Sequence, residues 1–472
     1  DELSLREREE LDRFLGEDTN HIFDLSKEIP FRFKLYKLGN KYYTSLVIHH
    51  IASDGWSNRI LISELKEYYE YHISKEKGEN RELELKQLPF SYKDYAIWQR
   101  RYLSGERLDN QLSYWKNKLE NYETIGLMGD KPRPKNIDYR GKNIGFELDK
   151  DTSSHLRDLA RKLNVSMYSL LLSGYYLMLR SYANQDDIVI GTPIANRHYK
   201  GTEELMGFFV NTLVLRKRIN SKELLSSYIK EVGEEILDAQ KYQDLPFEML
   251  VEKLEVEQDT SRHPIFQVMF GMNNFFEDGE IESYGKDFIS RYRGQDNILD
   301  GSYNPAKFDI TTMMDDSGEL IKGSFNYAIS IYEEETIGGY IKTYSEILKQ
   351  YAELAKDEKL LYREKISNLH YLNKEEYNRV ITEWNDTASP YPEEKLLHEL
   401  FEEQVKRTPN NIAVIYEDIE LTYKELNERS NRLAHYLIEE HKVKPDDMVA
   451  LCLDRSEHMI ITIMTHLTPI AS

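Results

Sequence analysis

The longest uncharged stretch of the sequence, LNVSMYSLLLSGYYLML, runs from Leu163 to Leu179. It is shorter than the ~20 apolar residues that span a bilayer, and it contains Asn, Ser and Gly. Such a segment must be enclosed by other parts of the chain. We therefore interpret it as a helix buried inside a globular core.

Length and composition agree with a multi-domain globular protein. The chain has 472 residues, of which 40% are hydrophobic, and ~150 residues per domain gives about three domains. The formal charge of −21 provides no general attraction to nucleic acid or anionic membranes, so we expect neither as a partner.

The single cysteine, Cys452, excludes an intramolecular disulfide and fits a reducing compartment. The densely charged first residues show no secretory signal, and we expect a cytoplasmic protein.

Strand and helix patterns follow one another in the first part of the chain. Residues 31–36 alternate between Phe or Leu and a more polar side chain, which is the period of a half-buried strand. After the turn signal Gly39-Asn40, residues 41–48 are rich in β-branched and aromatic side chains and predict a second strand. Ser57 can then cap an amphipathic helix. We expect a hairpin followed by a helix.

The prolines of residues 129–136 predict a connection between two lobes. Beyond them, strand patterns at 142–148 and 187–192 alternate with helix patterns at 152–163 and 166–182. This alternation predicts an α/β architecture in which sheets are backed by helices.

Two adjacent histidines stand at the end of the second predicted strand, in the sequence HHIASDG at residues 49–55. Neighbouring strand side chains point to opposite faces, so both imidazoles can face one cleft only if the strand has already ended. We expect one histidine to do chemistry and the other to pack or hydrogen-bond. By itself such a pair is more often structural. A zinc site is not favoured, because adjacent histidines do not share a helical ligand face and no Cys is near.

Four further motifs follow HHIASDG: YKDYAIW at 92–98, GFFVNT at 207–212 with Arg216, QDLPFE at 243–248 and DTSRHP at 259–264. In this order they resemble nonribosomal peptide synthetase condensation domains, members of the HHxxxDG acyl-transfer superfamily. The resemblance covers roughly residues 1–372. It implies a two-lobed, chloramphenicol-acetyltransferase-like fold in which each lobe is a sheet with helices.

The end of the sequence resembles the start of an adenylation domain, through NDT at 385–387, LHELF at 397–401 and LTYKEL at 421–426. No Gly-rich phosphate loop and no carrier-type serine motif are present. We therefore expect this chain neither to activate amino acids nor to carry a phosphopantetheine arm, and to condense substrates weakly or not at all by itself.

These resemblances predict four parts. Residues 1–125 are the N-terminal condensation lobe, incomplete at its start, and 126–372 are the C-terminal lobe. Residues 373–395 are a linker, and 396–472 are a truncated adenylation-domain fragment.

The implied activity is peptide-bond formation, in which the amine of a carrier-bound aminoacyl thioester attacks a carrier-bound acyl thioester. The implied partners are upstream and downstream peptidyl carrier domains and the adenylation domain of the same module. The chain itself is expected to bind no cofactor or metal, because the substrates hang on phosphopantetheine of separate carrier domains. The alternatives are an epimerization-like domain and a non-catalytic relative that recruits carriers. The adenylation start disfavours the first, and the intact HHxxxDG disfavours the second.

The candidate catalytic residues lie in the first motif and have unequal expected roles. His50 accepts the proton of the attacking amine or holds the amine by hydrogen bonding. His49 packs against neighbouring residues and supports the loop. Asp54 fixes the loop by an ion pair with Arg197 that bridges the lobes. Gly55 gives the turn backbone freedom and can bring an amide N–H near the reacting carbonyl.

Two further side chains are expected at the substrate tunnel that the resemblance implies. Trp98 belongs to the YKDYAIW motif. Asn211 lies on a strand and is equally compatible with a polar residue of the core.

Overall fold

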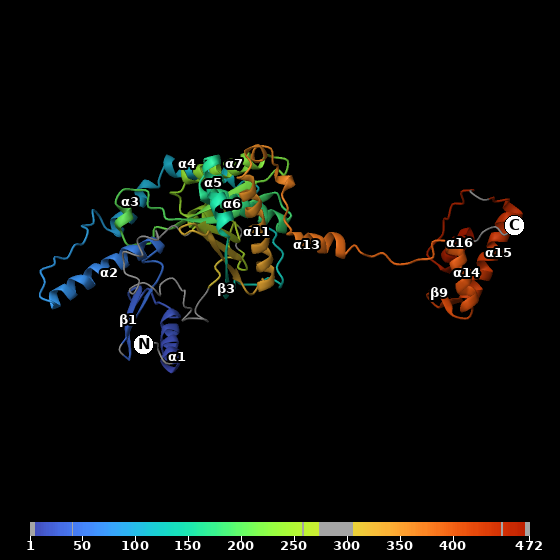
Figure 1. The fold of residues 1–472 in the computed structure, drawn as a ribbon, viewed down its shortest axis with the longest axis horizontal. Coiled ribbons are helices and arrows are strands. Elements are labelled where there is room, and N and C mark those ends of the chain that lie inside the picture. Colours follow the sequence, from blue (N-terminus) through green and yellow to red (C-terminus); the bar gives the residue numbers. More distant parts are fainter. Residues whose placement is uncertain (1–4, 40, 257–258, 273–304, 445–446, 468–472) are drawn as a thin grey trace. The chain divides into compact units, whose positions relative to one another are not determined.

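The computed structural model describes residues 5–39, 41–256, 259–272, 305–444 and 447–467. The chain divides into two compact units, residues 1–378 and 379–472, and each is described here by itself (Figure 1). The division falls inside the segment 373–395 that the sequence assigns to a linker.

The first unit opens with a helix and a hairpin. Helix α1 (Leu5–Thr19) precedes the antiparallel strands β1 (Phe31–Leu38) and β2 (Lys41–Ile48). These bounds confirm the predicted hairpin. Gly39 has a left-handed φ of 58°, which suits the turn, whereas its expected partner Asn40 lies outside the described residues.

Helix α1 covers the polar face of this hairpin. On that face Lys34 and Tyr36 both bind the buried carboxylate of Asp18, and the Tyr36 ring stacks on Phe14. The side chains on the apolar face of β1 are 44–58% exposed, namely Phe31, Phe33 and Leu35. The alternation thus predicts the strand correctly, but ionic contacts with α1 decide which of its faces is covered within the described chain.

Three helices follow the hairpin: α2 (Gly55–Glu76), α3 (Tyr92–Tyr102) and α4 (Glu106–Lys118). The expectation that Ser57 caps α2 is wrong. The helix starts earlier, at Gly55, because the Asp54 carboxylate accepts the Ser57 N–H at 2.9 Å and is the true N-cap. Helix α3 begins with a capping box formed by Ser91 and Asp94.

A six-stranded sheet forms the centre of the remaining part of this unit, in the order β3-β8-β7-β6-β4-β5. The β4–β6 and β6–β7 pairs are parallel, and the other neighbours are antiparallel. The strands are β3 (Gly141–Glu147), β4 (Asp187–Ile194), β5 (Asn211–Arg218), β6 (Val268–Met272), β7 (Ile310–Asp315) and β8 (Lys322–Ala328).

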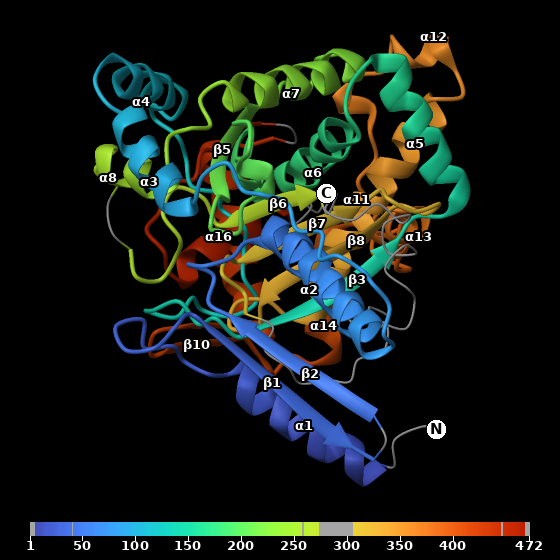
Figure 2. The same ribbon diagram turned by 90° about the vertical axis from the view of Figure 1, so that its left-hand side faces the viewer.

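Long helices pack on this sheet and on one another: α5 (Lys150–Leu163), α6 (Met167–Ala183), α7 (Leu225–Gln240) and α11 (Glu334–Leu354). Helix α6 contacts α5, α7 and α11 as well as β4 and β6 (Figure 2). Its residues 170–179 are all buried, which confirms the buried helix predicted from the uncharged stretch. None of the helices in the described part of the chain combines the length and apolar character of a membrane span.

Short helices complete the first unit: α8 (Phe247–Lys253), α12 (Glu358–Leu361) and α13 (Lys374–Asn378). The second unit contains α14 (Leu397–Arg407), the antiparallel strands β9 (Ile412–Tyr416) and β10 (Ile419–Thr422), α15 (Tyr423–His441) and α16 (Glu457–Leu467). Leu421, Leu426 and Ile461 form its small buried core.

Candidate active site

The histidine pair lies in a tight loop between β2 and α2. Strand β2 ends at Ile48, so both histidines lie beyond it and the alternation of strand side chains no longer applies to them. Two hydrogen bonds shape the loop, from Ala52 N–H to the His49 carbonyl at 3.0 Å and from Ser53 N–H to the His50 carbonyl at 3.4 Å. The loop therefore presents two imidazoles in independent orientations.

His50 is exposed, and one of its ring nitrogens is held by the loop. Its Nδ1 lies 2.6 Å from the Ser53 carbonyl oxygen. A carbonyl oxygen can only accept a hydrogen bond, so Nδ1 carries the proton in the neutral imidazole. The lone pair is then on Nε2, which can accept a proton or a hydrogen bond from another molecule.

His49 is half-buried and bound by its neighbours. Its Nδ1 accepts the Ile51 N–H at 3.1 Å, and its ring lies edge-to-face with Phe23 at 5.9 Å between centroids. Its backbone N–H donates to the Pro30 carbonyl at 2.9 Å. The two histidines thus differ as the sequence suggests, one open to solvent and one packed.

The structure contains the expected ion pair between Asp54 and Arg197. Arg197 Nη2 lies 2.9 Å from Asp54 Oδ1 and 3.1 Å from Oδ2, and the two side chains are 2% and 3% exposed. Burial lowers the pKa of Arg197, while the Asp54 charge acts in the opposite direction. Asp54 also accepts the Phe209 N–H at 3.0 Å. Its carboxylate is therefore occupied by contacts inside the protein.

Ser57 is a central member of this network that the sequence reasoning did not assign to the site. It is fully buried, and its Oγ lies 2.8 Å from Asp54 Oδ1 and 3.0 Å from the Gly207 carbonyl oxygen. It also accepts Gly207 N–H at 3.1 Å and Arg197 Nη2 at 3.0 Å. Its position two residues after HHIASDG is the sequence signal that could have indicated it. Its place in the network, however, depends on hydrogen bonds with residue 207, which is distant in sequence.

Gly55 does not need the backbone freedom that the sequence suggested. It is the first residue of α2, it is absent from the described residues with positive φ, and a Cβ there would meet no described atom within 4 Å. The helix, rather than a strained turn, sets its conformation. Its amide lies at the N-terminal end of α2, where backbone N–H groups lack intrahelical partners.

Asn211 and Trp98 lie in networks of their own. Asn211 Nδ2 donates to the carbonyls of Gln243 and Leu245 at 2.9 and 2.8 Å, and its Oδ1 accepts two backbone N–H groups, from Thr212 and Phe247. These contacts use all four hydrogen-bonding positions of the amide, so it has none left for a substrate. Of its two expected roles, these contacts support the structural one, for a side chain that is half-buried.

Trp98 is 36% exposed and packs against other aromatic rings. It stacks on Tyr102 at 4.6 Å and meets Tyr199 edge-on at 4.5 Å. Tyr199 Oη in turn donates to Asp244 of the QDLPFE motif at 2.9 Å. Two sequence motifs thus meet here, whereas the ring that His50 contacts is Phe208 and not Trp98.

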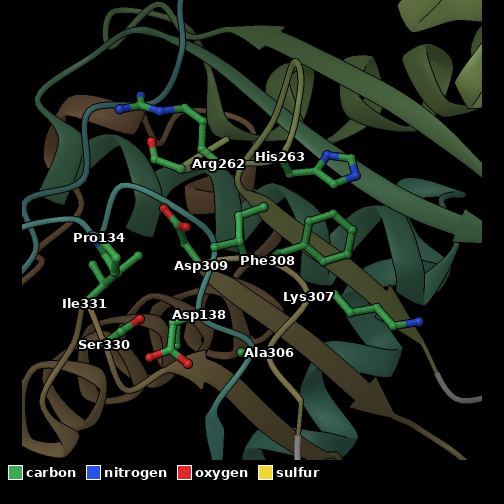
Figure 3. A pocket seen from close by; sticks show the side chains of 13 residues that line it. Pro134, Asp138, Arg262, His263, Ala306, Lys307, Phe308, Asp309, Ser330 and Ile331 are labelled. Atoms are coloured by element: carbon green, nitrogen blue, oxygen red, sulfur yellow. The ribbon is translucent and has the colours of Figure 1, made fainter. Parts of the chain in front are cut away.

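The DTSRHP motif lines a separate pocket, formed with residues 134–138 and 306–309. Figure 3 shows the rings of His263 and Phe308 next to each other there, with centroids 4.6 Å apart. Burial lowers the pKa of His263, which favours its neutral form. Arg133 binds Asp309 at the same place. None of the predicted catalytic residues is among the described residues that line this pocket.

Two family models match the chain. The one described as Condensation domain matches residues 2–376, and the one described as AMP-binding enzyme matches residues 401–467.

Curated relatives are much longer than this chain. The N-(5-amino-5-carboxypentanoyl)-L-cysteinyl-D-valine synthase of Amycolatopsis lactamdurans is 36% identical over 458 residues, which are 97% of this chain and 12% of that protein. Gramicidin S synthase 2 of Aneurinibacillus migulanus is 36% identical over 441 residues, 93% of this chain and 9% of that protein. The chain therefore spans a small part of the length of these relatives.

A solved structure shares the fold. A four-domain nonribosomal peptide synthetase bound to AMP and glycine matches with a TM-score of 0.71 and 23% identity, over 97% of this chain and 34% of that one. At this identity the likeness concerns the fold alone.

Proposed function

The chain belongs to the condensation-domain family of nonribosomal peptide synthetases and continues into the first part of an AMP-binding domain, and from this we propose that it forms peptide bonds. The amine of an aminoacyl thioester on one carrier attacks the carbonyl carbon of an acyl thioester on another. A C–N bond forms, the C–S bond breaks, and the proton lost by the amine balances the departing thiolate. Both thioesters hang on phosphopantetheine arms of separate upstream and downstream peptidyl carrier domains.

The fixed tautomer of His50 is the observation that supports this chemistry. Because Ser53 binds the Nδ1 proton, Nε2 is an acceptor on an exposed side chain. An α-amino group has a pKa of ~7.7–8.0, so about a tenth or more is already neutral near pH 7. Nε2 can therefore receive a hydrogen bond from a neutral amine and accept its proton as the C–N bond forms.

The remaining residues of the loop support His50 rather than react. The Asp54 carboxylate is bound by Arg197, by the Ser57 N–H and by the Phe209 N–H. The N–H of Gly55, in the first residue of α2, is the proposed donor to a developing oxyanion, which the positive end of the helix would favour.

We propose the lobes, linker and adenylation fragment at the residues that the sequence assigns: 1–125, 126–372, 373–395 and 396–472. The adenylation domain of the same module is the proposed partner through the last of these. The two family models, over residues 2–376 and 401–467, support the division between condensation and adenylation parts but do not bear on the boundary between the lobes.

The function is tested with two chemically loaded carrier proteins, one carrying an acyl group and one a panel of amino acids. The chain is added as it stands and within a longer synthetase. We expect the longer synthetase to form a dipeptidyl thioester on the acceptor carrier, detected by mass spectrometry, and the chain by itself to form little or none. His50→Ala should lower the single-turnover rate about 10²–10⁴-fold without changing thermal unfolding.

His72→Ala is the matched control, because His72 is an exposed histidine on α2 away from the loop. It should leave the rate unchanged, and His49→Ala should act mainly through stability. An unchanged rate in His50→Ala would refute the role of His50. Inversion of an aminoacyl centre without dipeptide would establish the epimerization alternative, and carrier binding without either product would establish the recruiting one.

A further inference from the structure

The His50 ring contacts an aromatic side chain from a distant part of the chain. The ring centroids of His50 and Phe208 are 5.0 Å apart, and the planes meet at 86°. This edge-to-face geometry is one that aromatic pairs prefer. Phe208 is the second residue of the GFFVNT motif and is 38% exposed, so the contact lies at the surface of the site rather than in the core.

The backbone around Phe208 is held by the start of α2, by its N-cap Asp54 and by α3. Three hydrogen bonds do this: Gly207 N–H to Ser57 Oγ at 3.1 Å, Phe209 N–H to Asp54 Oδ2 at 3.0 Å, and Tyr92 Oη to the Phe208 carbonyl at 2.7 Å. We call residues 207–209 with these three partners the clamp. A segment without regular secondary structure is thereby fixed just before β5 begins.

The absence of a side chain at residue 207 allows the clamp backbone to pack closely against the Tyr92 ring. A Cβ at this position would lie 2.2 Å from the Tyr92 ring, a distance that no side chain tolerates. The backbone can therefore approach Tyr92 only because residue 207 is glycine. Close packing and hydrogen bonding together hold the backbone from which the Phe208 side chain reaches His50.

We propose that Phe208 is a positioning residue for His50, and that Ser57 and Tyr92 act on His50 through it. The Nδ1 hydrogen bond to Ser53 restrains the imidazole at one edge, and only small rotations about the Cα–Cβ and Cβ–Cγ bonds remain. The contact with Phe208 fixes the plane of the ring and so the direction of Nε2. This inference rests on the proposed function of His50, because only a reacting imidazole needs that direction.

The contact is tested by NMR on the full chain labelled with ¹³C at histidine Cε1. The His50 signal is identified by its loss in His50→Gln. In Phe208→Leu the ring current disappears, and we expect the His50 signal to move while the other histidine signals stay. Phe208→Tyr keeps a ring and should restore the original position. An unmoved His50 signal in Phe208→Leu overturns the proposal.

The consequence for the reaction is tested in the two-carrier assay. Phe208→Leu should lower kcat about 10–100-fold, because a misdirected catalytic group costs rate, and should leave the KM for the acceptor carrier unchanged. Phe208→Tyr should recover most of the rate. Phe33→Leu is the matched control, since Phe33 is an exposed phenylalanine of β1. A normal kcat in Phe208→Leu overturns the positioning role.

Tyr92→Phe tests the clamp without removing the ring that packs on Gly207. It deletes only the hydrogen bond to the Phe208 carbonyl, and the His50 signal should move in the same direction as in Phe208→Leu, by less. An unmoved signal overturns the part assigned to Tyr92. If the signal moves in Phe208→Leu but His50→Ala condenses normally, the proposed function fails while the contact stands.

Discussion

Asp54 and Arg197 bring together two parts of the chain that are far apart in sequence. The guanidinium binds the carboxylate through Nη2, and its Nη1 donates to the carbonyls of Thr202 and Leu205. Its cationic face lies over the Phe209 ring, 4.1 Å from the centroid. A buried charge is stable only with such compensation, so each member of the pair depends on the other.

Asp54→Asn should therefore lower the free energy of unfolding by ~3–5 kcal/mol, because it leaves the Arg197 charge buried without a counter-charge. Urea unfolding measures this change. Glu319→Gln is the control, since Glu319 pairs with Lys150 at the surface, where the side chains are 67% and 74% exposed. The control should unfold like the unchanged protein. A fully stable but inactive Asp54→Asn would instead show a catalytic Asp54.

At the residue scale, the roles of residues inside a motif can be predicted from the sequence. Roles that arise from contacts between residues far apart in the chain cannot. The different surroundings of His49 and His50, and the ion pair of Asp54 with Arg197, agree with what the sequence predicts. Ser57 and Phe208 could not be found in this way, because their roles arise where residue 207 meets residue 57 and residue 208 meets residue 50. The hydrogen bonds of the Asn211 amide could not be found for the same reason: its partners, residues 243–247, are distant in sequence.

At the element scale, strands and helices were predictable to within a few residues, because hydrophobic period and turn residues are local signals. The hairpin shows the limit. Its register follows from the turn, but the covered face depends on Asp18 of α1, a single acidic residue that no periodicity singles out. The cap of α2 was misplaced for a similar reason, since Asp54 and Ser57 are both good capping residues.

Arg216 shows that one motif residue can join several elements. It binds Asp187 of β4, and its guanidinium donates to the carbonyls of residues 118, 120 and 121 at the end of α4. Cations are favourable at this end of a helix. The arginine of the GFFVNT motif thus attaches α4 to the sheet.

A pair of acidic residues links the segment after β5 to α7 and makes stability depend on pH. Burial raises the pKa of Glu223 to about 7, and the neighbouring Glu231 carboxylate adds to this shift. Glu231 is held by Lys217, at 2.5 Å. Between the usual glutamate pKa of 4.5 and about 7, the folded chain binds a proton that the unfolded chain has lost. Stability from Glu223 is therefore present at low pH and lost as pH rises through this window.

Thermal unfolding from about pH 5 to about pH 7 tests this link. The Tm of the unchanged protein should fall more steeply over this range than the Tm of Glu223→Gln, because the amide cannot lose a proton. Glu335→Gln, at an exposed position of α11, is the control and should keep the original slope. Equal slopes for Glu223→Gln and the unchanged protein would contradict the shifted pKa.

At the scale of the whole molecule, each unit has its own buried core. The core of the first unit surrounds α6, and the small core of the second involves Leu421, Leu426 and Ile461. Residues 382–397 between them are exposed. Two features of the sequence predict this division. One is the pair of prolines, Pro390 and Pro392, and the other is the change from condensation-domain motifs to adenylation-domain motifs.

Limited trypsin digestion should therefore cut first between residues 379 and 396 and release two resistant fragments, identified by mass spectrometry. Calorimetry of the intact chain should show two transitions, and each fragment should retain one of them, because apolar burial is separate in the two units. Loss of both transitions after a single cut would show that the units unfold together.

The uncovered apolar side of β1 makes the colloidal behaviour of this chain depend on ionic strength. The exposed side chains of Phe31, Phe33 and Leu35 form an apolar surface that favours association of two copies. The formal charge of −21 opposes this association by electrostatic repulsion. The range of that repulsion shrinks from ~10 Å at 0.1 M salt to ~3 Å at 1 M, whereas hydrophobic attraction is not screened. We therefore expect dilute buffer to keep copies apart and concentrated salt to favour their association through the hairpin.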